Sequence, residues 1–207
     1  RENWPNRGFE IVPPGEAELV FVSTDTAIDD KGNREQESLR EVINRIYSSI
    51  DVPLILTSQV TPGFTRSLNL PIWNMAETLR IKDARQRALN PDYFVFGYQN
   101  SAEPLPSSII KFTINFNVPF LLVTYEEAEF SKIAVNMTLA SQVDNANRLS
   151  KAAKTVGARW ERISEILAMD KRIGPYSYLT PGRWQDSQHL LRDYRTLQQI
   201  ENDWNIE

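Results

Sequence analysis

The 207-residue sequence predicts an α/β domain, built on a parallel sheet, that is followed by an all-helical domain based on one long helix. Two observations support this fold class. Up to about Tyr125, short apolar runs alternate with amphipathic stretches, which is typical of a parallel sheet covered by helices on both faces. Beyond that residue, long stretches without proline or glycine indicate helices. We therefore expect two domains, over residues 1–125 and 126–207.

The first domain is expected to contain four strands. Each is a short run rich in Val, Ile, Leu and Phe, bounded by polar or turn-forming residues. These runs occupy residues 19–23, 54–57, 93–97 and 120–124. Residues 35–50 predict a helix, because four apolar residues recur there at the i, i+3, i+4, i+7 spacing of one buried stripe.

The second domain is expected to be helical throughout. Residues 127–156 contain no proline and no glycine, and Gly157 is a plausible helix stop. At ~1.5 Å per residue, this helix would run for about 45 Å. Residues 160–169 and 187–201 predict two further helices, separated by a loop that contains two prolines and two glycines.

The composition argues against several kinds of site. The chain has no cysteine, which excludes disulfides, thiolate metal ligands and a cysteine nucleophile. Its single histidine argues against a histidine metal cluster or a Ser-His-Asp relay, so no metal site is expected. None of the eight glycines belongs to a Gly-x-Gly sequence, so the chain carries no glycine-rich phosphate loop.

Charge and hydropathy limit the kinds of partner that the protein is expected to bind. The formal net charge of -4 makes a broad basic surface for nucleic acid unexpected. No uncharged stretch reaches the ~20 apolar residues that a membrane span needs. The first residues also lack the apolar run of a signal peptide. We therefore expect a cytoplasmic protein that binds neither nucleic acid nor a membrane.

Five residues could carry chemistry, and each has a simpler interpretation. Lys132 and Asn136 share a helix face, where a cation and an amide could hold an alkoxide or a carboxylate, or could both face water. His189 could carry a proton near neutral pH, or lie on the surface. Asp92 could carry chemistry, or it could be a helix cap or a turn residue. Arg172 could present its guanidinium to an anion from a rigid loop, or be solvated there.

Several motifs occur in one order along the chain. They are Ser-Gln-Val-Thr-Pro-Gly at 58–63, Asn-Pro-Asp-Tyr-Phe at 90–94, Ala-Glu-x-x-Lys-x-x-x-Asn at 128–136, Asn147, Gly157, Arg-Ile-Gly at 172–174 and Pro-Gly at 181–182. Together they resemble the UDP-glucose/GDP-mannose dehydrogenase family, whose corresponding segments include S-T-V-P-P-G, N-P-E-F-L and A-E-x-x-K-x-x-x-N. The resemblance extends from about residue 16 to residue 193.

The resemblance implies a reaction and a set of site residues. Members of the family oxidise the C6 alcohol of a nucleotide sugar to a carboxylate with two NAD, through a thioester on a cysteine. By this resemblance, Lys132 and Asn136 stand at the oxyanion-stabilising positions, and Asp193 stands at the aspartate that helps to activate water. Asp92 stands at the glutamate of N-P-E, and Arg172 matches an arginine that meets the substrate across a dimer.

The departures from the family pattern put activity in doubt. Counting forward from Pro-Gly without a gap places His189 where the cysteine should be, and imidazole cannot readily carry the acyl intermediate. Residues 184–187 replace glycines with bulkier side chains, which should fill the sugar pocket. Gln59 stands where the family pattern has a threonine. Arg148 stands where it has a glutamate, which reverses the charge. The resemblance assigns NAD contacts only weakly, to Thr24 and Gln59, and the sheet is expected to be an incomplete Rossmann-like one without the Gly-rich first βαβ unit.

Three hypotheses follow. The first is a degenerate nucleotide-sugar dehydrogenase-like protein without dehydrogenase activity of its own, which serves as a scaffold, subunit or binding module. The second is an NAD-dependent oxidoreductase that acts on the CH-OH group of a nucleotide sugar, with parts supplied elsewhere. The third is an unrelated α/β protein. The family resemblance also implies a homodimer through the long helix at 127–156, a nucleotide-sugar ligand, and a place in a larger assembly.

Overall fold

The computed structural model describes residues 9–28, 34–77, 83–99 and 104–204. The chain divides into two compact units, Arg1–Lys132 and Ile133–Glu207. The division falls within one long helix, after Lys132 rather than at the expected residue 125.

The first unit is built on a five-stranded sheet in the order β1-β2-β3-β4-β5. Its strands are β1 (Val20–Val22), β2 (Leu54–Leu56), β3 (Trp73–Met75), β4 (Phe94–Tyr98) and β5 (Phe120–Thr124). The α/β class is confirmed, and the pairs β1–β2, β2–β3 and β4–β5 are parallel. The pair β3–β4 differs from the expected all-parallel sheet, because it is antiparallel. Strands β4 and β5 therefore run opposite to β1, β2 and β3. The sequence did not reveal β3, because its three residues are too few to produce a detectable period.

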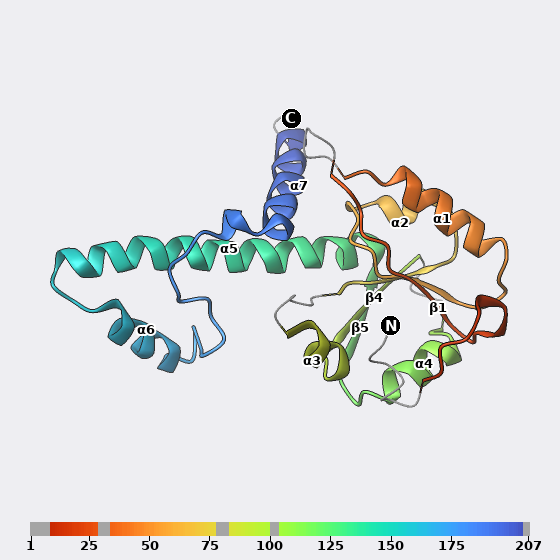
Figure 1. Ribbon diagram of the computed structural model, residues 1–207, viewed down its shortest axis with the longest axis horizontal. Coiled ribbons are helices and arrows are strands. Elements are labelled where there is room, and N and C mark those ends of the chain that lie inside the picture. The colour runs from red at the N-terminus through yellow and green to blue at the C-terminus, as the bar shows by residue number, and fades with distance from the viewer. Residues whose placement is uncertain (1–8, 29–33, 78–82, 100–103, 205–207) are drawn as a thin grey trace. The chain divides into compact units, whose positions relative to one another are not determined.

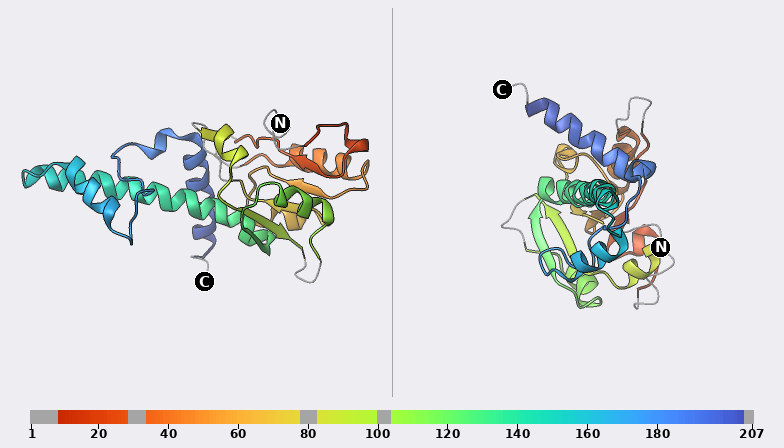
Figure 2. Two further views of the ribbon diagram at one scale, coloured as in Figure 1. Left: turned by 90° about the horizontal axis from the view of Figure 1, so that it is seen from below. Right: turned by 90° about the vertical axis from the view of Figure 1, so that its left-hand side faces the viewer.

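The described residues also form seven α-helices, of which α1 to α4 and the start of α5 belong to the first unit (Figures 1 and 2). They are α1 (Glu37–Tyr47), α2 (Phe64–Ser67), α3 (Ala84–Leu89), α4 (Ser107–Ile114), α5 (Tyr125–Thr155), α6 (Trp160–Met169) and α7 (Gln188–Trp204). The long helix predicted at 127–156 is confirmed as α5, and the helices predicted at 35–50, 160–169 and 187–201 are confirmed as α1, α6 and α7. No helix of the described residues is long and apolar enough to cross a membrane.

Two hydrophobic clusters pack on β2 from opposite sides. Leu54 and Leu56 join the cluster that includes Leu39 and Ile43 of α1. Ile55, which lies between them in the strand, joins the cluster formed with α4 and strands β3 and β4. Successive side chains of a strand point to opposite faces, so a strand covered on both sides is apolar at every position.

Strand β5 corrects one expectation. Its apolar sequence predicted a strand buried on both faces, but Phe120, Leu121 and Leu122 are 43%, 62% and 40% exposed. The reason is its position, because β5 lies at an edge of the sheet and pairs only with β4. A continuous apolar run therefore did not distinguish a central strand from an exposed edge strand.

The first turns of α5 pack closely against β4 at Gly97. A Cβ atom at this glycine would lie 2.7 Å from Cβ of Ala128, 3.1 Å from the carbonyl oxygen of Thr124 and 3.2 Å from Cα of Tyr125. The hydroxyl of Tyr125 also donates a hydrogen bond to the carbonyl of Ile72, just before β3. The start of α5 thus belongs to the packing of the first unit.

In the second unit, hydrogen bonds tie the segment after α6 to the helices. Asn147 donates to the carbonyl of Gly182 at 2.7 Å and accepts from its amide at 2.9 Å. The indole of Trp160 donates to the carbonyl of Leu179 at 2.9 Å. Gly157, with a φ of 73°, ends α5 in the left-handed conformation, which confirms it as the helix stop.

Candidate functional site

A small cavity of about 20 Å3 lies where β2 and β3 end, beside the start of α5. Ser58 and Gln59 follow β2, Glu77 follows β3, and Glu129 and Lys132 come from α5. The ends of parallel strands bring these polar loop residues to one edge of the sheet, which is where ligands of open α/β sheets bind. The geometry therefore marks this edge as the candidate site of the first unit.

Lys132 has a defined position in this cavity. Its ammonium donates a hydrogen bond to the backbone carbonyl of Glu77, the second residue after β3. The side chain is partly buried. A cation held in this way can stabilise negative charge on a group that enters the cavity.

Glu129 fixes the turn that follows β2. Its carboxylate is 5% exposed and accepts hydrogen bonds from the amides of Gly63 at 2.6 Å and Thr65 at 2.8 Å. Gly63 has a φ of 89°, a conformation that favours glycine. Burial raises the pKa of Glu129, although the hydrogen bonds to Thr65 and Gly63 work against this effect. The two amides at the start of α2 are therefore occupied by the protein's own carboxylate.

Glu77 is a candidate site residue that the sequence analysis missed. It lines the cavity beside Lys132 and also a second cavity, of about 50 Å3. Burial raises the pKa of its carboxyl, and the ammonium of Lys132 partly opposes this effect. The one available signal was its place after the apolar residues Ile72 and Trp73, but no strand was predicted there.

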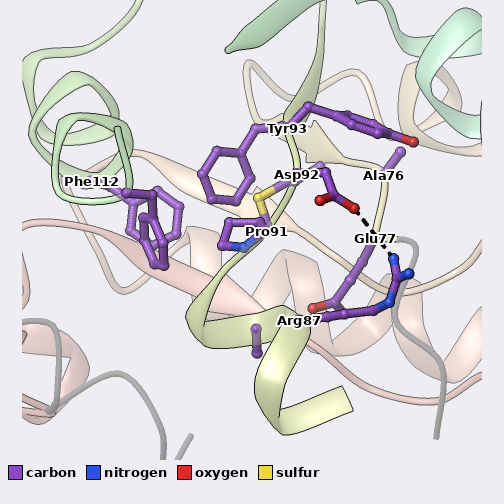
Figure 3. Close-up of a pocket in the computed structure, with 11 residues that line it drawn as sticks. Ala76, Glu77, Arg87, Pro91, Asp92, Tyr93 and Phe112 are labelled. Carbon is purple, nitrogen blue, oxygen red and sulfur yellow. Dashed lines mark ion pairs between the residues drawn. The ribbon is translucent and has the colours of Figure 1, made fainter. Parts of the chain in front are cut away.

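Asp92 does not share the cavity of Lys132. It precedes β4 and lines the second cavity, where its carboxylate lies 3.6 Å from the guanidinium of Arg87 (Figure 3). Its side chain is 77% exposed. Among the acidic residues described, Glu77 and Glu129 line the cavity of Lys132, whereas Asp92 lies outside it.

Thr24 and Gln59 lie in neighbouring loops after β1 and β2. The amide of Thr24 donates to the hydroxyl of Ser58 at 2.9 Å, and the carbonyl of Gln59 accepts from the hydroxyl of Thr26 at 2.9 Å. A dinucleotide also needs free amides at a glycine-rich turn for its pyrophosphate. The amides of Gly63 and Thr65, at the turn after β2, do not meet that need, because they are bound to Glu129.

In the second unit, α7 brings Asp193 against Asn136 of α5. The amide of Asn136 donates to the Asp193 carboxylate at 2.5 Å, and Asp193 is fully buried. His189 lies one turn earlier on α7 with an exposed side chain, and its Nδ1 is 3.3 Å from the guanidinium of Arg192. Asn136 and Asp193 are therefore brought together, whereas the imidazole lies at the surface.

The segment before α7 forms a 3-10 turn, Trp184–Asp186. The ring of Trp184 packs edge-on against Tyr194 of α7, with centroids 5.3 Å apart. Trp184 is half-buried, and Arg183 and Asp186 approach each other to 3.5 Å. Bulky side chains therefore occupy this stretch.

Arg172 projects into solvent from the loop after α6. Its guanidinium binds the carboxylate of Asp170 through two hydrogen bonds, of 3.0 and 2.7 Å, and its side chain is 88% exposed. These hydrogen bonds hold the pKa of Asp170 below its ordinary value. The guanidinium is thus bound to its own loop.

Comparison with known proteins shows what the chain is similar to. A model of the central domain of the UDP-glucose/GDP-mannose dehydrogenase family matches residues 126–207. The match covers the helical part of the chain, from the first turn of α5 onward. The UDP-glucose 6-dehydrogenase of Rickettsia typhi is 23% identical over 202 residues, which cover 92% of this chain and 46% of the relative. An uncharacterized protein of Methanocaldococcus jannaschii, MJ1054, is 27% identical over 177 residues, which cover 78% of this chain and 20% of the relative.

Solved structures show the same fold. A UDP-glucose dehydrogenase from Pyrobaculum islandicum has a TM-score of 0.66 at 21% identity, and the match covers 87% of this chain and 49% of that chain. The chain therefore spans about half the length of the UDP-glucose dehydrogenases that it matches. The chain thus shares the fold of this dehydrogenase over most of its own length.

Proposed function

We propose that this chain is a degenerate member of the UDP-glucose/GDP-mannose dehydrogenase family that serves as a scaffold, subunit or binding module and has no dehydrogenase activity of its own. The observation that carries the proposal is the state of the family's cysteine position. The family resemblance implies that His189 occupies this position, and its imidazole lies at the surface. An imidazole cannot form the thiohemiacetal and thioester on which the two-step oxidation depends.

Two further observations support the proposal. Asp193 is buried against Asn136, so its carboxylate is not exposed to an incoming water molecule. The amides of the turn after β2 are bound to Glu129 and do not offer a cradle for the pyrophosphate of NAD. A family scaffold that keeps its packing but lacks these functions is suited to binding rather than catalysis.

The alternative is an NAD-dependent oxidoreductase that acts on the CH-OH group of a nucleotide sugar: a single hydride passes from the alcohol carbon to NAD, the hydroxyl proton passes to a base, and the alcohol becomes an aldehyde. This reaction does not need the cysteine. It is supported by Lys132, whose ammonium lies at the ends of the sheet strands beside the buried carboxyl of Glu77. A cation and a carboxyl of raised pKa are groups that can polarise an alcohol and accept its proton.

One experiment separates the two proposals. The full chain is titrated with NAD and with UDP-glucose at millimolar concentrations by calorimetry, and reduction of NAD is followed at 340 nm. We expect no saturable NAD binding and no reduction. Turnover that is lost in Lys132→Ala and kept in Lys151→Ala, an exposed lysine on the same helix, would refute the proposal and establish the alternative.

The family resemblance also leads us to propose a homodimer through α5. Sedimentation of the full chain at about 100 µM tests it. The expected particle has twice the mass of one chain, and a monomer at this concentration would contradict the proposal.

A further inference from the structure

The outer edge of β5 carries backbone groups that no strand of the described residues uses. Strand β5 pairs with β4 alone (Figure 1). The amide of Phe94 donates to the carbonyl of Pro119 at 3.0 Å, in a parallel register that sets Phe94 opposite Phe120. Backbone groups alternate between the two sides of a strand, so those of Leu121 face β4, whereas those of Phe120 and Leu122 point away from it. Among the described residues, no strand pairs with this outward side.

This edge also lacks the features that protect edge strands. Charged side chains, proline and β-bulges are the usual protections against pairing with another chain. Residues 120–124 contain neither a charge nor a proline, and their pairing with β4 has no bulge. Their apolar side chains are exposed on both faces, since Phe120 and Leu122 point to one face and Leu121 to the other. The edge therefore has the properties of a surface that accepts a further strand.

The charges around β5 limit the kind of strand that fits. Residues 112–131 contain no lysine and no arginine, but they contain three glutamates. This stretch therefore offers no cation to an acidic protein or to an anionic lipid surface. The strand itself is uncharged, and apolar cross-strand pairs would stabilise its pairing. A neutral, apolar strand is the matching partner, and residues 120–124 of a second copy supply one.

We propose that two copies of this chain pair antiparallel along β5, with a two-fold axis at Leu121, and so join their sheets into one. Phe120 of each copy then lies opposite Leu122 of the other, and these two pairs exchange both of their N–H···O bonds. Every outward-pointing amide and carbonyl of the two residues is used in this register. Leu121, which is more exposed than Phe120 and Leu122, meets its own copy at the position between, where cross-strand side chains lie closest. The antiparallel arrangement also keeps Glu126 and Glu127 of the two copies at opposite ends of the contact.

The contact is small, so we expect the pairing to be weak and reversible. A stable interface buries about 800 Å2 on each partner, and an edge of five residues offers less than that. Pairing should therefore become appreciable only above roughly 100 µM. The proposal goes beyond the proposed function and is separate from the homodimer through α5, because β5 ends before α5 begins.

The test uses the absence of cysteine from the chain, because a single introduced thiol then reports the pairing. In the proposed register, the two Cα atoms at position 121 would lie about 4.5 Å apart, which a disulfide can bridge. At about 300 µM with oxidised glutathione, Leu121→Cys should form disulfide-linked dimers at least tenfold faster than Ile114→Cys. Ile114 of α4 is 69% exposed and Leu121 is 62% exposed, so exposure alone predicts no such difference. Equal rates would overturn the proposal, and no cross-linking at all would leave the edge to a strand of another protein.

Two further variants separate this contact from the α5 homodimer. Leu121→Lys places like charges opposite each other on the two-fold axis, and it should weaken the association measured by sedimentation above 100 µM at least tenfold. A folded Leu121→Lys that associates like the parent would contradict the proposal. Leu149→Lys, changed at an exposed leucine of α5, is combined with Leu121→Cys and should still cross-link. Loss of cross-linking in this double variant would show that α5 brings the copies together, and the pairing along β5 would then be refuted.

Discussion

Adding a single methyl group at Gly97 tests whether the start of α5 is packed directly on the sheet. In Gly97→Ala, the new carbon would lie 2.7 Å from Cβ of Ala128, which real side chains do not tolerate, and 3.1 Å from the carbonyl of Thr124. Helix and strand must therefore separate or shift. Overpacking of this kind costs about 1–3 kcal/mol. Since Gly97 does not have a positive φ, the cost is steric and not conformational.

The assay is urea unfolding followed by circular dichroism. Gly15→Ala is the matched control, because no atom lies within 4 Å of the corresponding Cβ position. The double variant Gly97→Ala, Ala128→Gly removes the closest contact, so it should be destabilised by about 1 kcal/mol less than the sum of the two single changes. If Gly97→Ala unfolds within about 0.5 kcal/mol of the control, the close packing of α5 on β4 is refuted.

Three other variants probe the buried polar groups. Burial raises the pKa of Glu77 above its ordinary 4.5, so just above that pH the native chain holds more protons than the unfolded chain. The free energy of unfolding should therefore fall as the pH rises. Glu77→Gln should reduce this slope in urea titrations between pH 5 and 8. Asn136→Ala removes a donor from the buried Asp193 and should cost about 1–3 kcal/mol, whereas Asn145→Ala, exposed on the same helix, should cost little. Glu129→Gln replaces an acceptor of two backbone amides and should lower the melting temperature by several degrees, measured by calorimetry; an unchanged value would show that these hydrogen bonds contribute nothing.

The long helices were predictable from sequence because their signals are long. Helix α5 has a run of residues without proline or glycine and a glycine stop, and α1 has a clear buried stripe. Strand β3 was not predictable, because three residues that include the polar Asn74 give no period. The exposure of β5 was not predictable either, since position in the sheet depends on the whole topology and not on local composition.

The candidate site was predictable only where a motif marked it. The spacing of Lys132 and Asn136 indicated a shared helix face, and the order of motifs indicated Asp193. Glu77 has no such mark, because its role depends on the end of a strand that the sequence did not reveal. The motif Asn-Pro-Asp at 90–92 indicates Asp92 as a site residue, but Asp92 lines a different cavity from Lys132. These differences arise from tertiary contacts that no local pattern encodes.

The hydrogen bonds of Glu129 also constrain the order of folding. They join residues that are 66 and 64 positions apart, Gly63 and Thr65 on one side and Glu129 on the other. The turn after β2 can therefore reach its final geometry only after the intervening residues have folded and the start of α5 has packed beside this turn. Closing so long a loop is entropically costly and slows assembly. We therefore expect the turn after β2 to be one of the last parts of the α/β unit to fold, because it needs Glu129 of α5.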